Sequence, residues 1–450
     1  MKNHTPQSQL LSIGLFLFCL FLLPACNILK QSTETTLTTN DKRSLKAFLF
    51  PYIPDAGEDN FAGLIKMLEE KFEADNPDVD LTITMDANVN IYDTTTIQTM
   101  LGDGDGAYDV VELDAVLLNY LVDQDLVPDF DSSFIQNIYP SAWTATQKDG
   151  KFYGMPTYLC SNIIYAYSTE IENAANGTEL VEVLKGLQSG PTPLVGNFAG
   201  SWTLPSTYID AYGDTYDNQA ATLLKAYSPP LDAGTMVPFS QVVDACQDAQ
   251  GKNPCLDGTY KDNSEAEQLL AANNANGFIG YSERLYYISK FNPDTLPDLI
   301  SAPIGGGSNP VMFVDALFFN KECANSNECG GDASNFMYFM NQVETRNIIA
   351  FSLDVPQEKR IPRYLLQANK NFYTSAPAKD NGIYQKLKTR VTDLALPIPS
   401  DDLLNRRHVL NDSLKAALDN HEYDPQVLKS TKSVKAAHYR ALSRFPERFD

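Results

Sequence analysis

The feature that most constrains the fold is a strand–helix–strand pattern close to the start of the chain. An apolar run over residues 45–50 stops at a proline-rich turn, and Phe61–Phe72 then carries apolar residues at helical spacing. Val79–Met85 follows and alternates apolar and polar residues, as a half-buried strand does. Strands joined through a helix usually pair in parallel, so this pattern predicts an α/β fold in which helices cover a sheet.

The length and charge of the chain narrow its range of partners. The 450 residues are enough for two or three domains, and the formal net charge is −23 at pH 7. We expect no nucleic-acid partner, because that binding depends on Lys and Arg that meet phosphates. An acidic field favours cationic ligands, although the same charge also serves simply to keep an exported protein soluble.

The amino terminus carries the pattern of an export signal. Lys2 precedes an uncharged apolar run, Leu10–Leu23, which has the length of a signal-peptide core and is short for a membrane span. We therefore expect residues 1–26 to be a signal peptide and the protein to leave the cytoplasm. It would then be periplasmic, secreted or anchored by a lipid to a bacterial membrane.

The end of this leader leaves two fates open. Leu23–Cys26 resembles a bacterial lipobox, in which Cys26 would be lipidated and become the first residue of the mature protein. Pro24 is not the favoured residue at its position, so a lipoprotein and a freely secreted protein both remain open. Residues 27–43, rich in Ser, Thr and Asn, predict a flexible tether. We expect membrane contact only through such a lipid anchor.

Five cysteines follow the leader. Cys246 and Cys255 bracket one short polar turn, and Cys323 and Cys329 bracket another. In an oxidising compartment both pairs are consistent with short-loop disulfides. That pairing would leave Cys160 as the free thiol. A free thiol is either a candidate nucleophile or a small buried apolar residue.

Acidic residues lie in or at the end of two predicted strands. Glu112 and Asp114 close the strand 108–114, and ligands of open α/β sheets bind beyond the carboxyl ends of strands. Asp114 is alternatively explained as a helix cap. Asp315 lies inside the predicted strand Met312–Phe319, where it is either buried with a partner or faces a cleft.

The histidines argue against several chemistries. His408, His421 and His438 all lie near the carboxyl terminus, and no metal-ligand spacing of His or Cys occurs, so we expect no metal site. No Gly-rich phosphate loop follows a strand, and we expect no cofactor. A carboxylate can replace histidine as the base for Cys160. Glu283 is the candidate, because it stands among tyrosines at a predicted strand-to-helix junction. The alternative is an acid that only favours the helix dipole.

Several motifs, together with Asp315, resemble segments of thiaminase I (thiamine pyridinylase), a family within the type II periplasmic binding protein fold. The motifs are Pro51–Pro54, Leu159–Asn162, Thr203–Ser206 with Tyr208–Ala211, and Gly280–Glu283. The resemblance implies a two-domain α/β protein with mixed sheets, flanking helices and an interdomain cleft. We expect domain 1 over 44–165 plus about 310–370, and domain 2 over 166–309 plus part of about 371–425. Residues 426–450 would form a basic helical tail.

The resemblance also implies an activity. In that family a cysteine adds to the pyrimidine ring of thiamine, a glutamate assists its deprotonation, and the thiazole leaves. An amine, pyridine or thiol then takes the place of the thiazole. The matching positions make Cys160 the nucleophile, Glu283 the base, and Asp315 the acid that binds the aminopyrimidine. The positions expected at the substrate are Tyr52, Glu112, Asp114, Tyr281 and Asp315, with the choice between Glu112 and Asp114 open.

A binding protein is the alternative function. It would deliver thiamine or another cationic small molecule to a transporter, and it would share the fold, which does not decide function. In either case an acidic, tyrosine-lined cleft would hold the positive thiazolium by charge and cation–π attraction. We expect a monomer whose partners are thiamine and a small nucleophilic co-substrate.

Overall fold

The computed structural model describes residues 42–187, 190–200, 202–216, 219–262, 265–307, 310–400 and 403–423. The expected signal peptide, the candidate lipidation site Cys26, most of the tether and the basic tail lie outside these residues. Within the described ranges, no helix has both the length and the apolar character needed to cross a membrane.

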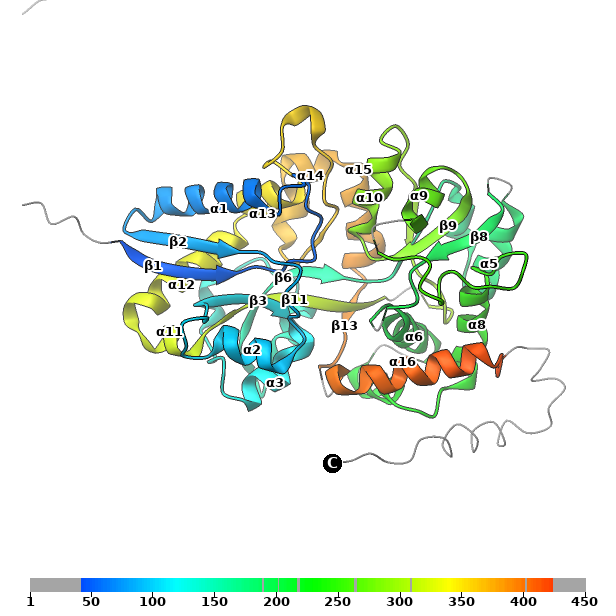
Figure 1. The fold of residues 1–450 in the computed structure, drawn as a ribbon, viewed down its shortest axis with the longest axis horizontal. Helices are drawn as coiled ribbons and strands as arrows, with labels where there is room; N and C mark the ends of the chain where they lie inside the picture. The colour runs from blue at the N-terminus through cyan, green and yellow to red at the C-terminus, as the bar shows by residue number, and fades with distance from the viewer. Residues whose placement is uncertain are drawn as a thin grey trace, which may run out of the picture. The chain divides into compact units, whose positions relative to one another are not determined.

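The larger sheet combines parallel and antiparallel strands (Figure 1). Across the described part of the sheet the order is β12 (Leu366–Gln367), β6 (Gly154–Cys160), β11 (Val311–Phe319), β3 (Val110–Asp114), β1 (Arg43–Phe48) and β2 (Val79–Thr84), with β13 (Leu396–Pro397) beside β11. β1 is parallel to β2 and β3, whereas β11 is antiparallel to β3 and β6. The predicted strand–helix–strand unit is confirmed, because α1 (Ala62–Asp75) connects the parallel strands β1 and β2.

A smaller mixed sheet lies in the middle of the chain. Its described strands run in the order β10 (Asp298–Ser301), β7 (Ile163–Ala166), β9 (Ala275–Gly280) and β8 (Thr192–Gly196). The chain passes from the larger sheet to the smaller one at Ser161 and Asn162, and it returns through β11. β4 (Gln147–Lys148) and β5 (Lys151–Phe152) form a separate hairpin. Two mixed sheets with flanking helices confirm the expected α/β architecture, and the residue boundaries of the domains stay a prediction.

Helices surround both sheets. In Figure 1, α1 and α13 are drawn above the strands of the larger sheet, and α2 and α3 below them. The helices of the first half are α2 (Thr94–Leu101), α3 (Leu118–Asp123), α4 (Pro140–Ala145), α5 (Gly177–Gly186), α6 (Thr203–Thr215), α7 (Ala220–Leu223) and α8 (Ala233–Asp244). Those of the second half are α9 (Glu265–Ala271), α10 (Arg284–Phe291), α11 (Lys321–Asn325), α12 (Asn327–Asn341), α13 (Val343–Ala350), α14 (Ala376–Asp380), α15 (Gly382–Leu387) and α16 (Leu403–Asp419).

Local sequence explains where several helices begin. The side chain of Asp93 accepts from the Thr96 backbone N–H at 2.8 Å before α2, and Asp232 does the same for Thr235 before α8. These caps satisfy backbone donors that have no partner inside the helix. Pro205 lies in the first turn of α6, where its missing N–H breaks no helical hydrogen bond.

The cysteine prediction is confirmed. Cys246 pairs with Cys255 and Cys323 pairs with Cys329, which leaves Cys160 free among the described cysteines. Both disulfides close short loops, and neither includes a residue of β6, the strand that carries the free thiol.

Candidate active site

Cys160 is the last residue of β6, where the chain leaves the larger sheet. Phe313 of β11 lies opposite Cys160, and Asp315, two positions further along β11, shares the same face of the sheet. The Cys160 thiol donates to Asp315 Oδ2 at 3.8 Å. Cys160 is partly exposed, so solvent has access to this residue.

The surroundings of Cys160 disfavour a thiolate. Burial raises the pKa of the thiol well above its ordinary value, and the negative charges of Asp315 and Glu283 raise it further. Near neutral pH the sulfur therefore keeps its proton. A reaction that needs the thiolate also needs a base that removes this proton as the sulfur attacks.

Asp315 is 3% exposed, in the middle of a strand that is buried along its whole length. Its backbone carbonyl accepts from the Thr157 hydroxyl at 3.0 Å. Burial raises the pKa of the Asp315 carboxyl well above its usual value, and the charges of Asp114 and Glu112 add to the effect. This rise favours the protonated carboxyl, which can donate as well as accept a hydrogen bond.

Glu283 stands between β9 and α10 and is 9% exposed. Within the described chain its side chain makes no capping hydrogen bond to α10, and its Oε1 lies 3.7 Å from Arg284 Nη2. Burial raises the pKa of Glu283, while the positive charge of Arg284 opposes that shift. A carboxylate with a raised pKa is a stronger base than a solvated glutamate.

Asp114 ends β3 and makes two hydrogen bonds with its side chain. Oδ1 accepts from the Val116 backbone N–H at 3.0 Å, which confirms the expected cap, and Oδ2 accepts from the Tyr92 hydroxyl at 3.2 Å. Burial raises the pKa of Asp114 to about 6, against the opposing effects of these hydrogen bonds and of Arg407. At neutral pH most of this carboxyl is therefore ionised.

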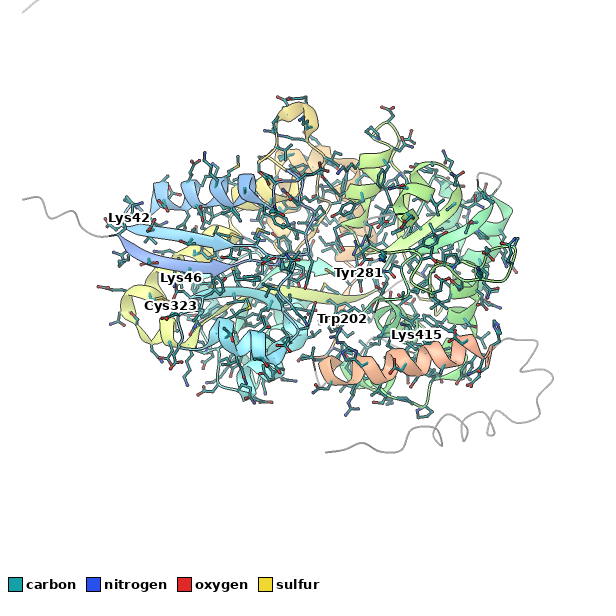
Figure 2. All side chains as sticks on the ribbon, in the orientation of Figure 1. Lys42, Lys46, Trp202, Tyr281, Cys323 and Lys415 are labelled. Atoms are coloured by element: carbon teal, nitrogen blue, oxygen red, sulfur yellow. A yellow bond between two sulfur atoms is a disulfide. The ribbon has the colours of Figure 1, made fainter. Side chains whose placement is uncertain are left out.

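Tyr281 follows β9 and brings the smaller sheet to the same region. Its hydroxyl shares a hydrogen bond of 2.9 Å with the Ser206 hydroxyl of α6. Burial raises the pKa of Tyr281, and the nearby Cys160 and Glu283 add to this shift. In Figure 2 the labelled Tyr281 and Trp202 lie between the elements of the two sheets.

Glu112 and Tyr52 are the other two residues expected at the substrate. Glu112 is 1% exposed inside the larger sheet, where its Oε2 accepts from the Phe50 backbone N–H at 2.9 Å and Arg346 opposes the rise in its pKa caused by burial. Tyr52 is 41% exposed, and its hydroxyl donates to the Val89 carbonyl at 3.3 Å. Asp315, Glu283 and Asp114 are the carboxyls whose charges act on the Cys160 thiol, and the thiol in turn acts on Tyr281.

Sequence reasoning missed three side chains beside this group. The rings of Tyr92 and Trp202 have centroids 4.9 Å apart, and Trp202 also packs edge-on against Phe313 at 6.0 Å. Arg407 lies over both Trp202 and Tyr92. Trp202 directly precedes a motif that resembles thiaminase I, which was the available signal for it, whereas Tyr92 and Arg407 had none.

One group among the described residues has the composition of a metal site, namely Asp109 with Cys323 and Cys329. The two sulfurs are joined in a disulfide, so neither offers the thiolate that a metal would need. The described residues therefore give no set of metal ligands near Cys160.

Comparison with known proteins assigns the chain to a family. A model described as bacterial extracellular solute-binding protein matches residues 55–342. The chain belongs to this family. Among curated proteins, Thiaminase-1 of Paenibacillus thiaminolyticus is 23% identical over 355 residues, which cover 76% of this chain and 80% of that relative. This similarity confirms the resemblance carried by the motifs.

Several solved structures share the fold of this chain. Thiaminase I from Bacillus thiaminolyticus has a TM-score of 0.63 at 21% identity and covers 83% of this chain and 99% of its own. Clostridium botulinum thiaminase I in complex with thiamin has a TM-score of 0.62 at 16% identity, with 82% and 100% covered. Maltose-bound T. maritima MalE3 has a TM-score of 0.62 at 16% identity and covers 84% of this chain and 95% of its own. The two-domain periplasmic binding protein fold is thus confirmed.

Proposed function

We propose that this member of the solute-binding family is a thiamine-cleaving transferase of the thiaminase I type (thiamine pyridinylase). The observation that carries the proposal is the contact of the free Cys160 thiol with Asp315, beside the charges of Glu283 and Asp114. A transport protein needs no thiol among carboxyls. The curated relative and two of the solved structures are thiaminases, which supports the same substrate.

In this proposal Cys160 is the nucleophile and Glu283 its base. The raised pKa of the thiol means that few molecules carry a thiolate, so proton removal must accompany attack. Glu283 suits this step because its own pKa is raised by burial. The sulfur adds to the pyrimidine ring next to the carbon that bears the methylene, and the ring electrons then expel the thiazole. A second nucleophile bonds to the methylene, and Cys160 leaves with the electron pair of the carbon–sulfur bond.

Asp315 and Asp114 take complementary roles. A protonated Asp315 donates to a pyrimidine nitrogen and accepts from the exocyclic amine, which draws electrons from the ring that the sulfur attacks. Asp114, with a pKa of about 6, carries the negative charge that attracts the thiazolium. In this proposal the different environments of the two neighbouring carboxyls give them different protonation states, so that one donates a hydrogen bond and the other carries a negative charge. Tyr281 and Tyr52 would supply aromatic contacts to the substrate.

The remaining parts of the proposal concern partners and place. We propose that the co-substrate is a small amine, pyridine or thiol, that the protein acts as a monomer, and that it is exported. The extracellular solute-binding family supports export. Whether it is periplasmic, secreted or held by a lipid on Cys26 is decided by mass spectrometry of the mature amino terminus.

A binding protein that feeds a transporter is the second candidate. The family match and the similarity to maltose-bound T. maritima MalE3 favour it. This candidate predicts that thiamine binds and is recovered intact.

The deciding experiment is incubation of the purified protein with thiamine and aniline or pyridine, followed by mass spectrometry of the exchange product. We expect thiamine loss with wild type and none with Cys160→Ser, which should still bind thiamine. Glu283→Gln should lower kcat by about 10²–10⁴-fold with little change in binding. Asp315→Asn should weaken thiamine binding as well. Intact thiamine from wild type would refute the enzyme, and an active Cys160→Ser variant would refute the nucleophile.

A further inference from the structure

Helix α16 lies beside elements that belong to both sheets. It contacts the turn Ala115–Leu117, which follows β3 of the larger sheet, and α6, which follows β8 of the smaller one. Lys415 of α16 also donates to the Ala199 carbonyl at 3.1 Å, just ahead of α6. In Figure 1, α16 is drawn directly below α6. This helix begins after residue 400, beyond the segments that resemble thiaminase I and beyond the family match at residues 55–342.

Arg407 extends from α16 onto two aromatic rings. Its guanidinium carbon lies 4.2 Å from the centre of the Trp202 ring and 5.4 Å from that of Tyr92. The two rings are 4.9 Å apart and tilted by 46°, so one cation contacts both. Arg407 is 8% exposed, and a cation–π contact strengthens when water is removed from it.

Both rings connect directly to the candidate site. Tyr92 donates from its hydroxyl to Asp114 Oδ2 at 3.2 Å. Trp202 packs edge-on against Phe313, which is the residue of β11 opposite Cys160. A change in the packing of Arg407 therefore affects Asp114 through the single side chain of Tyr92. It affects β11, the strand beside the thiol, through the single side chain of Trp202.

We propose that Arg407 is a positioning residue of the candidate site, which clamps Trp202 against Tyr92 and thereby fixes the carboxyl of Asp114. Only the choice of thiamine as a probe rests on the proposed function. The contact with the rings does not depend on any ligand.

Arg407 also acts on Asp114 through charge. Burial raises the pKa of Asp114, and the positive charge of Arg407 is one of the effects that oppose this rise. Loss of that charge moves the pKa of Asp114 upward. The titratable or charged side chains that act on Asp114 within the described residues are Tyr92 from the loop before α2, Arg407 from α16, Asp315 from β11 and Cys160 from β6.

Tryptophan fluorescence tests the clamp without any ligand. The chain has two tryptophans, Trp143 and Trp202, so Trp143→Phe makes Trp202 the sole reporter. In that background we expect Arg407→Ala to increase acrylamide quenching about twofold or more, because the ring loses its cover. Arg407→Lys should restore part of the protection. Arg406→Ala, on the same helix and bonded to Ser228, is the matched control and should leave quenching unchanged.

Thiamine binding to the Cys160→Ser protein supplies the second readout. Arg407→Met keeps much of the side-chain bulk and removes the charge, so we expect the acid limb of the binding profile to move upward from about 6 by as much as about one pH unit. A purely structural change would weaken binding without moving that limb. If Arg407→Ala does not fold, Arg407→Met and Arg407→Lys carry both measurements.

The two ideas fail separately. Unchanged Trp202 quenching in the Arg407 variants overturns the clamp, whether or not thiamine binds. If quenching increases in the Arg407 variants while the wild-type protein neither binds nor cleaves thiamine, the clamp stands and the proposed function is refuted. An acid limb that stays in place although quenching increases overturns the link from Arg407 to Asp114.

Discussion

A single buried carboxyl holds both connections between the two sheets. Asp210 of α6 accepts from the Val311 backbone N–H at 2.9 Å and from the Asn162 side chain at 3.3 Å. Asn162 lies on the outgoing connection, between β6 and β7, and Val311 begins the returning strand β11. The Ser161 hydroxyl, which donates to the Val311 carbonyl at 2.8 Å, ties the same two segments together. The protonation of Asp210 should therefore affect the stability of the fold.

The size and sign of this effect follow from burial. Asp210 is fully buried, and burial raises its pKa from 3.8 to about 7. A difference of about three units between the folded and unfolded chain corresponds to about 4 kcal/mol. Since the folded pKa is the higher one, the folded state retains a proton that the unfolded state releases. The resulting stability is fully present below pH 3.8 and is lost as the pH rises to about 7.

The test compares wild type with Asp210→Asn by urea unfolding between about pH 4.5 and pH 8. Asparagine keeps the shape of the side chain and never ionises. The free energy of unfolding of the variant, relative to that of wild type, should therefore increase as the pH rises, by at most about 4 kcal/mol. Asp294→Asn, at an exposed position, is the control and should run parallel to wild type. A difference between Asp210→Asn and wild type that stays constant with pH would refute the reasoning.

Three further predictions concern packing, a buried ion pair and the thiol. Gly154→Ala places a methyl group 2.6 Å from the Phe318 ring, so it should lower the free energy of unfolding by about 1–3 kcal/mol, measured by urea unfolding; wild-type stability would contradict this. Arg363→Met should lower the free energy of unfolding by about 3–5 kcal/mol, because Arg363 is fully buried and contacts Asp354 at 2.7 and 2.8 Å. Adding Asp354→Asn to this variant should recover part of the lost stability in thermal melts. Cys160 should react with iodoacetamide more slowly than free cysteine at pH 7, because burial and nearby carboxyls raise the pKa of its thiol. The reaction rate should still rise above pH 9, and a rate that levels off below pH 8 would contradict this prediction.

Local patterns predicted the framework of the candidate site well. The strand that ends at Cys160, the strand that holds Asp315 and the junction before Glu283 were all evident, because apolar periodicity reports on neighbouring residues. The same patterns could not separate Glu112 from Asp114. Both belong to one strand that is buried throughout, and only the packing of Arg346 and Tyr92 distinguishes their surroundings.

The sequence alone predicted an α/β framework, two short disulfide loops and Cys160 as the free thiol, because these depend on periodicity and on the spacing of near neighbours. Tertiary structure decided what surrounds that thiol. Asp315 meets Cys160 across 155 residues of chain, and Arg407 reaches Trp202 and Tyr92 from a helix near the carboxyl terminus. Such contacts, and the pKa shifts that burial brings with them, exist only once distant segments pack and exclude water.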